Sequence, residues 1–409
     1  MEKIRFFTFG CKVNQYDSQI FMELLSEQGY QITDENHYDI ALINTCCVTK
    51  KAEKEAKRLI RKLVDTGKMV WITGCLVEKD DLVSIFSDAR IIRRNIFYQQ
   101  AESKGIDKIK TFHSHMRAFV KIVDGCENFC SYCIIPFVRG KISSRPISKI
   151  INEVKVLADN SYKEIVLAGI DLGSFGKDTG ENLKDLVKQI NEIKGLARFR
   201  LSSIEVFHLN EQLLDVLCLC DKFCPSFHVP LQSGSDRILK LMGRPYSSSD
   251  YKRKLEQIEA RFKNITFTTD IMIGFPGETQ SDFDLTLQAI SDCKFLKVHI
   301  FPFSPHKQTK AASMPENVPD TVKKERLRKA MQFTERISAD VKRSFIGKQC
   351  DVLVEAKLSD FWFGYSEHYI PVLIDSSEQL SGKILKICPK EIKSFGNTDY
   401  LFAKSSTLP

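Results

Sequence analysis

The chain has 409 residues, of which 43% are hydrophobic and 27% charged, and its 60 basic residues slightly outnumber its 52 acidic ones. This composition is typical of a globular protein and excludes a disordered chain, while the length predicts two or three domains. No apolar leader or membrane-length run is found, which predicts a cytoplasmic protein without a membrane partner. The 13 cysteines would be reduced there, so metal binding or catalysis explains them better than disulfides do.

The first 112 residues alternate short apolar runs with helical patterns. The runs cover residues 4–9, 40–44 and 69–73, and helical patterns at 17–27 and 51–63 separate them. This rhythm predicts a doubly wound parallel sheet. Cys11, Cys46 and Cys75 each follow one of the runs. Since parallel strands end at one edge of a sheet, we expect these thiols to converge, although each alone could be a small buried residue.

Residues 113–345 continue the alternation and predict a partial parallel (β/α)6 barrel, so the whole chain is expected to be of the α/β class. The candidate strands are residues 118–123, 164–167, 199–203, 227–230, 266–273 and 296–301. No Gly-x-Gly-x-x-Gly opens a helix, so a dinucleotide-binding fold is not supported. Polar residues follow these strands at the edge where barrel enzymes place active sites, at 169–176, 202–205, 232–235 and 274–278.

The first barrel strand leads into Cys126, Cys130 and Cys133, with Tyr132 before the last cysteine. Three thiolates can hold three irons of a [4Fe–4S] cube and leave the fourth iron open. A structural zinc site or cluster closes its shell with a fourth Cys or His, and none follows within about twenty residues. The spacing therefore favours a catalytic cluster over a zinc knuckle or buried free cysteines.

Three further cysteines, Cys218, Cys220 and Cys224, follow a helical stretch and are interpreted as packing residues.

Residues 322–345 predict a helix whose start is basic, which indicates either a solvated face or a phosphate-binding one; its cations are Lys323, Lys324, Arg326, Arg328 and Lys329. Residues 346–409 read as short strands of a small OB-like β-barrel. Its aromatic residues could stack on RNA bases or fill a core: Phe361, Trp362, Phe363, Tyr365 and Tyr369.

The Cys-x3-Cys-x2-Cys motif resembles the signature of the radical S-adenosylmethionine (SAM) enzymes. Nearly the full chain is similar to one branch of them, the radical SAM methylthiotransferases, through residues 10–16, 44–46, 73–75, 231–235 and 274–279. The resemblance implies an N-terminal methylthiotransferase domain at 1–112, a radical SAM domain at 113–345 and a C-terminal TRAM domain at 346–409.

The resemblance also implies the cofactors, namely SAM and two [4Fe–4S] clusters. The SAM cluster would be held by Cys126, Cys130 and Cys133 and an auxiliary cluster by Cys11, Cys46 and Cys75, whereas Cys47 is not expected to be a ligand. Candidate SAM contacts are Asp171, Ser202, Ser203, Gln232 and Ser235. One SAM would methylate a sulfur carried at the auxiliary cluster, and another would supply the radical that abstracts hydrogen from the target carbon.

The substrate is implied by residues 12–16 and 364–369, which most resemble the enzymes that methylthiolate C2 of N6-threonylcarbamoyladenosine beside the tRNA anticodon. The expected partners are then a tRNA anticodon stem-loop and an electron donor such as flavodoxin or ferredoxin. Sister branches act on isopentenyladenosine in tRNA or on a ribosomal-protein aspartate, and both stay open. Asp171, Val206 and residues 306–310 depart from the family pattern. A non-enzymatic iron–sulfur RNA-binding protein is the alternative of another class, but such a protein gains nothing from an exposed iron.

Overall fold

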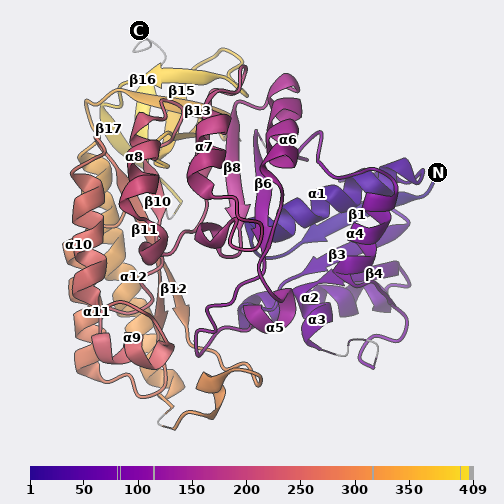
Figure 1. The fold of residues 1–409 in the computed structure, drawn as a ribbon, viewed down its shortest axis with the longest axis horizontal. Helices are drawn as coiled ribbons and strands as arrows, with labels where there is room; N and C mark the ends of the chain where they lie inside the picture. The colour runs from indigo at the N-terminus through magenta and orange to yellow at the C-terminus, as the bar shows by residue number, and fades with distance from the viewer. Residues whose placement is uncertain (81, 83, 114–115, 316, 397, 405–409) are drawn as a thin grey trace.

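A computed structural model describes residues 1–80, 82, 84–113, 116–315, 317–396 and 398–404. The chain runs from a parallel sheet at the N-terminus through a central array of strands and helices to a second sheet at the C-terminus (Figure 1). The prediction of an α/β protein is confirmed. No helix among the described residues is long and apolar enough to span a membrane.

The N-terminal sheet has five parallel strands in the order β2-β1-β3-β4-β5. All residues of its central strand β3 are buried, because helices cover a doubly wound sheet on both faces. The elements are β1 (Lys3–Thr8), α1 (Lys12–Glu27), β2 (Gln31–Ile32), β3 (Ile40–Thr45), α2 (Lys50–Asp65), β4 (Met69–Gly74), α3 (Cys75–Lys79), β5 (Arg90–Ile91) and α4 (Arg94–Ser103). The predicted parallel sheet is confirmed.

The central strands form two hydrogen-bonded groups, β7-β6-β8-β9 and β10-β11-β12. Isolated parallel bridges from Phe199 to Phe223 and from Ser203 to His228 join the groups. Six parallel strands therefore follow one another in the order β6-β8-β9-β10-β11-β12, as the partial barrel predicts. The strands are β6 (Arg117–Asp124), β7 (Ser143–Ser144), β8 (Glu164–Gly169), β9 (Arg198–Leu201), β10 (Ser226–His228), β11 (Thr266–Ile273) and β12 (Lys297–Pro302).

Helices cover the outer face of these strands, and α1 of the N-terminal sheet packs on β6 and β8 from the inner side. The alternation along β11 shows the two faces: Phe267 and Ile271 join the main core, while Thr268 and Asp270 point inward. The central helices are α5 (Ile135–Arg139), α6 (Ile147–Asp159), η1 (Leu172–Ser174), α7 (Leu183–Asn191), η2 (Val206–His208), α8 (Glu211–Leu219), α9 (Asp236–Met242), α10 (Ser248–Glu259), α11 (Gln280–Cys293), η3 (Lys310–Ser313) and α12 (Asp320–Arg343).

The C-terminal sheet has six strands in the order β16-β13-β14-β15-β18-β17, antiparallel except for the β15–β18 pair. The described pairings run from β16 at one edge to β17 at the other, around a separate core that includes Val352, Trp362 and Ile374. The strands are β13 (Cys350–Leu358), β14 (Phe361–Ser366), β15 (Pro371–Asp375), β16 (Ile384–Ile387), β17 (Glu391–Phe395) and β18 (Thr398–Lys404).

Buried arginines fasten this C-terminal sheet to the N-terminal ends of the barrel strands. Glu164, fully buried at the start of β8, accepts hydrogen bonds from Arg198 Nε at 2.6 Å and Arg200 Nε at 2.8 Å, and Arg117 lies 3.5 Å away. Burial alone would raise the pKa of Glu164, but the three guanidiniums outweigh it and lower the pKa to about 2.

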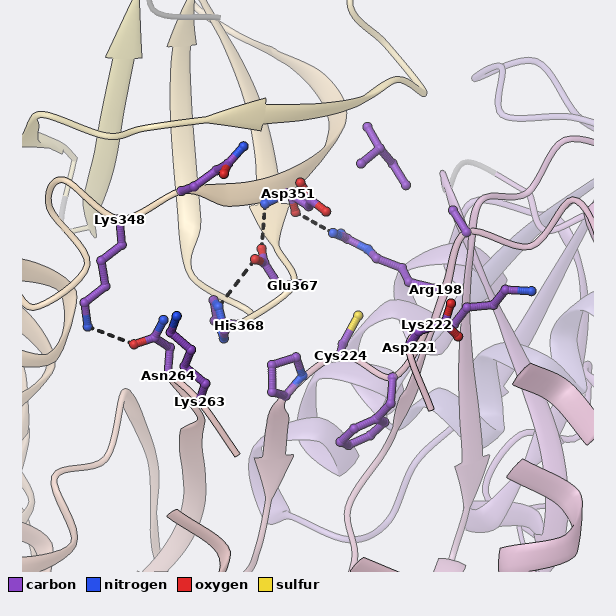
Figure 2. A pocket seen from close by; sticks show the side chains of 15 residues that line it. Arg198, Asp221, Lys222, Cys224, Lys263, Asn264, Lys348, Asp351, Glu367 and His368 are labelled. Carbon is purple, nitrogen blue, oxygen red and sulfur yellow. Dashed lines mark hydrogen bonds and ion pairs between the residues drawn. The ribbon is translucent and has the colours of Figure 1, made fainter. Parts of the chain in front are cut away.

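The same two arginines cross into the C-terminal sheet. Arg198 donates to Asp351 O at 2.6 Å, and Arg200 donates to Ser366 O at 2.6 Å. A cavity of about 670 Å³ lies beside this junction. Figure 2 shows its lining residues, among which Arg198 reaches Asp351 and Lys348 reaches Asn264. The junction lies at the strand ends opposite the predicted active-site edge.

Candidate functional site

The loop after β6 carries the first cysteine triad and is fixed by backbone contacts. Gly125 has φ of +75°, and a Cβ there would lie 1.9 Å from Lys141 O, so the turn before Cys126 requires glycine. Ser131 N donates to Met242 O at 2.9 Å, and Ser131 O accepts from Ala311 N at 2.7 Å. The loop is therefore held between the end of α9 and the helix η3.

The structure brings Cys126, Cys130 and Cys133 together. Burial raises the pKa of Cys126 to about 11 and that of Cys133 to about 12, and a charge on Cys130 adds to both shifts. Iron must therefore displace protons when it binds these thiols. Within the part of the chain that the structure describes, no three ligating side chains surround a single ion site. Three neighbouring thiols on one loop are the donor set that a [4Fe–4S] cube requires, because its thiolates bind different irons.

Arg244 places a cation beside this triad. Its Nη1 lies 3.4 Å from Cys130 Sγ, its Nε donates to Tyr246 Oη at 2.9 Å, and its Nη2 pairs with Glu205. Sequence reasoning did not single out Arg244, because nothing in the segment after Gly243 marks it as a partner of a cysteine more than a hundred positions away. Its charge can offset negative charge that builds up at the thiolates.

Asp171, which follows β8, is tied to the cysteine loop. Its Oδ2 accepts from Asn128 Nδ2 at 2.9 Å and from Ser174 Oγ at 2.7 Å, and its Oδ1 lies 3.2 Å from His208 Nε2. Burial favours the neutral carboxyl, yet the bonds from His208 and Ser174 outweigh it and lower the pKa of Asp171. Asn, the usual residue of the family pattern at this position, would replace one of these acceptor oxygens with a donor, which His208 would have to accommodate.

The other predicted SAM contacts lie at the same strand ends. Ser202 is buried, and its hydroxyl has no hydrogen-bond partner among the described residues. Ser203 bridges to β10, and Gln232, at φ of +71°, pairs its backbone with β11. Ser235 differs, since its Oγ donates to Asp282 Oδ1 at 2.6 Å and accepts from Ile238 N at 3.4 Å as the cap of α9.

The second triad gathers at the C-terminal edge of the N-terminal sheet. Cys11 is the exposed N-cap residue of α1, Cys46 follows β3, and Cys75 follows β4, which neighbours β3. Burial raises the pKa of Cys46 to about 12, and charges on Cys75 and Cys11 add to this shift. The three thiols thus lie within electrostatic range of one another, as their positions after parallel strands predicted.

Among the cysteines outside both triads, Cys47, Cys220 and Cys224 are buried. Cys218 is exposed, so its interpretation as a packing residue is wrong, because it lies on the solvent-facing side of α8. Cys47 is buried in the core of the N-terminal sheet and donates to Cys75 O at 3.6 Å. Cys218 and Cys220 donate to carbonyls on different elements, those of Arg261 and Val187, both at 3.9 Å. Cys224 is buried near Arg200. Cys218, Cys220 and Cys224 therefore do not form a common site.

A buried charge network joins the two triads. Arg139, six residues after Cys133, lies with Nε 3.2 Å from Cys75 Sγ and donates through Nη1 to Asp17 Oδ2 and Asp124 Oδ2, both at 3.0 Å. Lys121 adds a second cation at 2.7 Å from Asp17 and 3.1 Å from Asp124. Because Asp17 belongs to α1 and Asp124 ends β6, the network fixes one cysteine scaffold against the other.

Several residues considered for RNA contact make contacts within the protein. Trp362 lies in the C-terminal core, while Tyr365 and Tyr369 stack on each other at 4.9 Å with Arg117 over both rings. On α12, Arg326 is buried and pairs with Glu278 at 2.6 Å. Lys323 packs on Gly274 with a side chain only 12% exposed. Lys324 and Arg328 are exposed cations of that helix turn.

Two family models match the chain: the radical SAM superfamily over residues 120–290, and an uncharacterized protein family, UPF0004, over residues 3–93. Each match contains one of the two cysteine triads. Among solved structures, the radical SAM methyltransferase TsrM from Kitasatospora setae superimposes with a TM-score of 0.54 at 14% identity, covering 76% of this chain and 77% of its own. At that identity the likeness concerns the fold alone.

Sequence relatives extend over nearly the full chain. Proteins named threonylcarbamoyladenosine tRNA methylthiotransferase MtaB are 35% identical in Thermotoga maritima, covering 90% of this chain and 91% of the relative, and 38% identical in Chlamydia pneumoniae, covering 88% of each. A protein of Acetivibrio thermocellus named tRNA-2-methylthio-N(6)-dimethylallyladenosine synthase is 33% identical, covering 95% of this chain and 88% of the relative.

Proposed function

The chain belongs to the radical SAM methylthiotransferase family, and from this premise we propose that it adds a methylthio group to C2 of N6-threonylcarbamoyladenosine in tRNA. The observation that carries the proposal is the presence of two cysteine triads joined by one buried charge network. The names of its relatives from Thermotoga maritima and Chlamydia pneumoniae support this nucleoside as substrate.

We assign Cys126, Cys130 and Cys133 to the cluster that binds SAM and Cys11, Cys46 and Cys75 to an auxiliary [4Fe–4S] cluster. When bound, the first cluster supplies the electron that cleaves SAM, and the second carries the sulfur. The chain's own residues hold and shield these groups. Arg244 sets a positive charge beside Cys130, and Ser202 leaves a buried hydroxyl available to a polar atom of SAM.

In this proposal each of the three domains has its own role. Residues 1–112 carry the auxiliary site, 113–345 the SAM site, and 346–409 a TRAM domain that contacts RNA. The partner is a tRNA anticodon stem-loop, which the exposed cations Lys324 and Arg328 can meet at its phosphates. A flavodoxin or ferredoxin supplies electrons.

The experiment separates the two triads by replacing one thiol of each. Cys133→Ala removes a ligand of the SAM site, so 5′-deoxyadenosine and the modified nucleoside should both disappear. Cys75→Ala spares that site and should retain 5′-deoxyadenosine formation under strong reductant while losing methylthio transfer. Cys218→Ala, an exposed cysteine outside both triads, is the matched control and should behave as the wild type.

Chromatography of deoxyadenosine and mass spectrometry of tRNA nucleosides give the two readouts. Normal methylthiolation by Cys75→Ala would contradict the role of the auxiliary site. Methylthio-isopentenyladenosine as the sole product would instead assign the chain to the activity named for the Acetivibrio thermocellus relative.

A further inference from the structure

Lys12, the first residue of α1, lies beside the first strand of the partial barrel. Its Nζ is 6.0 Å from the ring centroid of Phe119 on β6, the first of the six parallel strands. Its charge also reaches His299 on β12, the last strand, where burial lowers the pKa of the imidazole to about 4; Asp270 opposes this shift, and Lys297, His228 and Lys12 add to it. The ammonium therefore lies beside β6 and within electrostatic range of His299 on β12.

Around His299 on the inner side, the charges of Lys12 and Lys297 stand against that of one nearby carboxylate, Asp270. Asp270 on β11 pairs with His228 Nε2 at 3.3 Å, and His228 Nδ1 lies 2.8 Å from Thr268 Oγ1, so this carboxylate is engaged. Lys12 is partly buried and has no carboxylate within ion-pair distance among the described residues, whereas Lys297 is exposed. A cation left without an anion at a partly buried position favours an anionic ligand.

Solvent reaches this inner face, so a ligand can enter it. The side chains of His228 and Asp270 are 22% and 27% exposed although both stand on strands of the barrel. Lys12 also directly follows Cys11 of the second triad. A group held by Lys12 is therefore placed beside the thiols proposed to hold the sulfur-carrying cluster.

We propose that Lys12, with His299 as a second hydrogen-bonding group, binds the carboxylate of the threonylcarbamoyl substituent of the target adenosine. This inference rests on the proposed function and deepens it by naming the residue that selects the substrate. An isopentenyl substituent carries no charge, so it would leave the Lys12 ammonium desolvated and unpaired. Lys12 thus determines which N6 substituent the site accepts, and its contact with that substituent orients the adenine ring.

The test compares binding of three anticodon stem-loop RNAs to the cluster-loaded protein by fluorescence anisotropy. They carry N6-threonylcarbamoyladenosine, the methyl ester of the same nucleoside, or unmodified adenosine. The wild type should bind the carboxylate form about 10- to 100-fold more tightly than the ester, as expected for one charge-assisted hydrogen bond. Lys12→Met should bind both forms equally, at the affinity of the ester.

Lys155→Met is the matched control, because Lys155 is an exposed lysine on α6, which covers the outer face. It should keep the wild-type preference. A preference retained by Lys12→Met would overturn the inference, and so would loss of iron from that variant, which would assign Lys12 to the cluster. A wild type that methylthiolates this nucleoside but binds the ester equally well refutes the inference alone. A wild type that modifies only isopentenyladenosine refutes the proposed function.

Discussion

Replacing Arg139 with Met tests whether the buried charge network holds the N-terminal sheet against the barrel. The Arg139 and Asp17 side chains are both 0% exposed, and Asp124 is 19% exposed. Removing the guanidinium leaves Asp17 and Asp124 to Lys121 and the more distant Arg94 in a low-dielectric interior, and breaking a buried pair in this way costs up to about 3–5 kcal/mol. That loss is a large share of the roughly 5–15 kcal/mol that stabilises a typical domain.

The assay is urea unfolding of the cluster-free protein, followed by tryptophan fluorescence. The chain has two tryptophans, so replacing Trp362 with Phe in every variant leaves Trp71 on β4 as the reporter of the N-terminal sheet. With an m-value of about 1–3 kcal/mol/M, the Arg139→Met midpoint should fall by about 1 M or more. Adding Asp17→Asn removes one stranded charge, so the double variant should lose less than the sum of the single losses.

The matched control is Arg253→Met, since Arg253 pairs with Asp250 at 3.1 Å on the surface, where the two side chains are 64% and 54% exposed. Its expected cost is about 0–1 kcal/mol. If both arginine variants shift the midpoint equally, the network contributes no more than a surface pair, and the coupling argued from its geometry is wrong.

Two further predictions concern the C-terminal sheet and RNA binding. The lowered pKa of Glu164, about 2 against an ordinary value of 4.5, corresponds to roughly 3 kcal/mol of stability that is present above pH 4.5 and lost as the pH falls toward 2. Glu164→Gln should therefore be less stable than the wild type at pH 7 and should lack this acid-dependent loss. The measurement is Trp362 fluorescence from pH 7 to pH 2, and a variant whose profile matches that of the wild type would contradict the prediction. Replacing Lys324 and Arg328 with Ala should reduce the slope of log affinity for tRNA against log salt by roughly 1 to 2 units. An unchanged slope would mean that these residues lie on a solvated face and contact no phosphate.

The sequence predicted the long strands well because a buried strand between helices leaves a continuous apolar run. The run at 118–123 became Arg117–Asp124, and the run at 69–73 became Met69–Gly74. The strands Gln31–Ile32, Arg90–Ile91 and Ser143–Ser144 were missed, because two residues carry no periodicity. Convergence of the N-terminal cysteines was predictable, since parallel topology alone places strand ends at one edge.

Side-chain partners were much less predictable. Ser235 also caps α9, a role that a serine before a helix signals but that was not predicted, while its contact with SAM stays a prediction. Arg139 and Arg244 were missed because their partners lie far away in the sequence: Asp17 is 122 positions from Arg139, and Cys130 is 114 positions from Arg244. A basic residue at such a position has the same local pattern whether it faces water or a buried carboxylate.

The missed arginines change how the two triads relate to each other. A transfer between two sites requires a fixed separation, and a flexible linker between domains would let that separation vary. Here Asp124 and Arg139 flank the first triad in sequence, while Asn14 and Asp17 stand on the helix that Cys11 caps. Arg139 contacts the side chains of Asp124, Asn14 and Asp17, and it also contacts Cys75 Sγ. Displacing one triad would thus separate several buried opposite charges at once, so the relative position of the triads is set by the folded core.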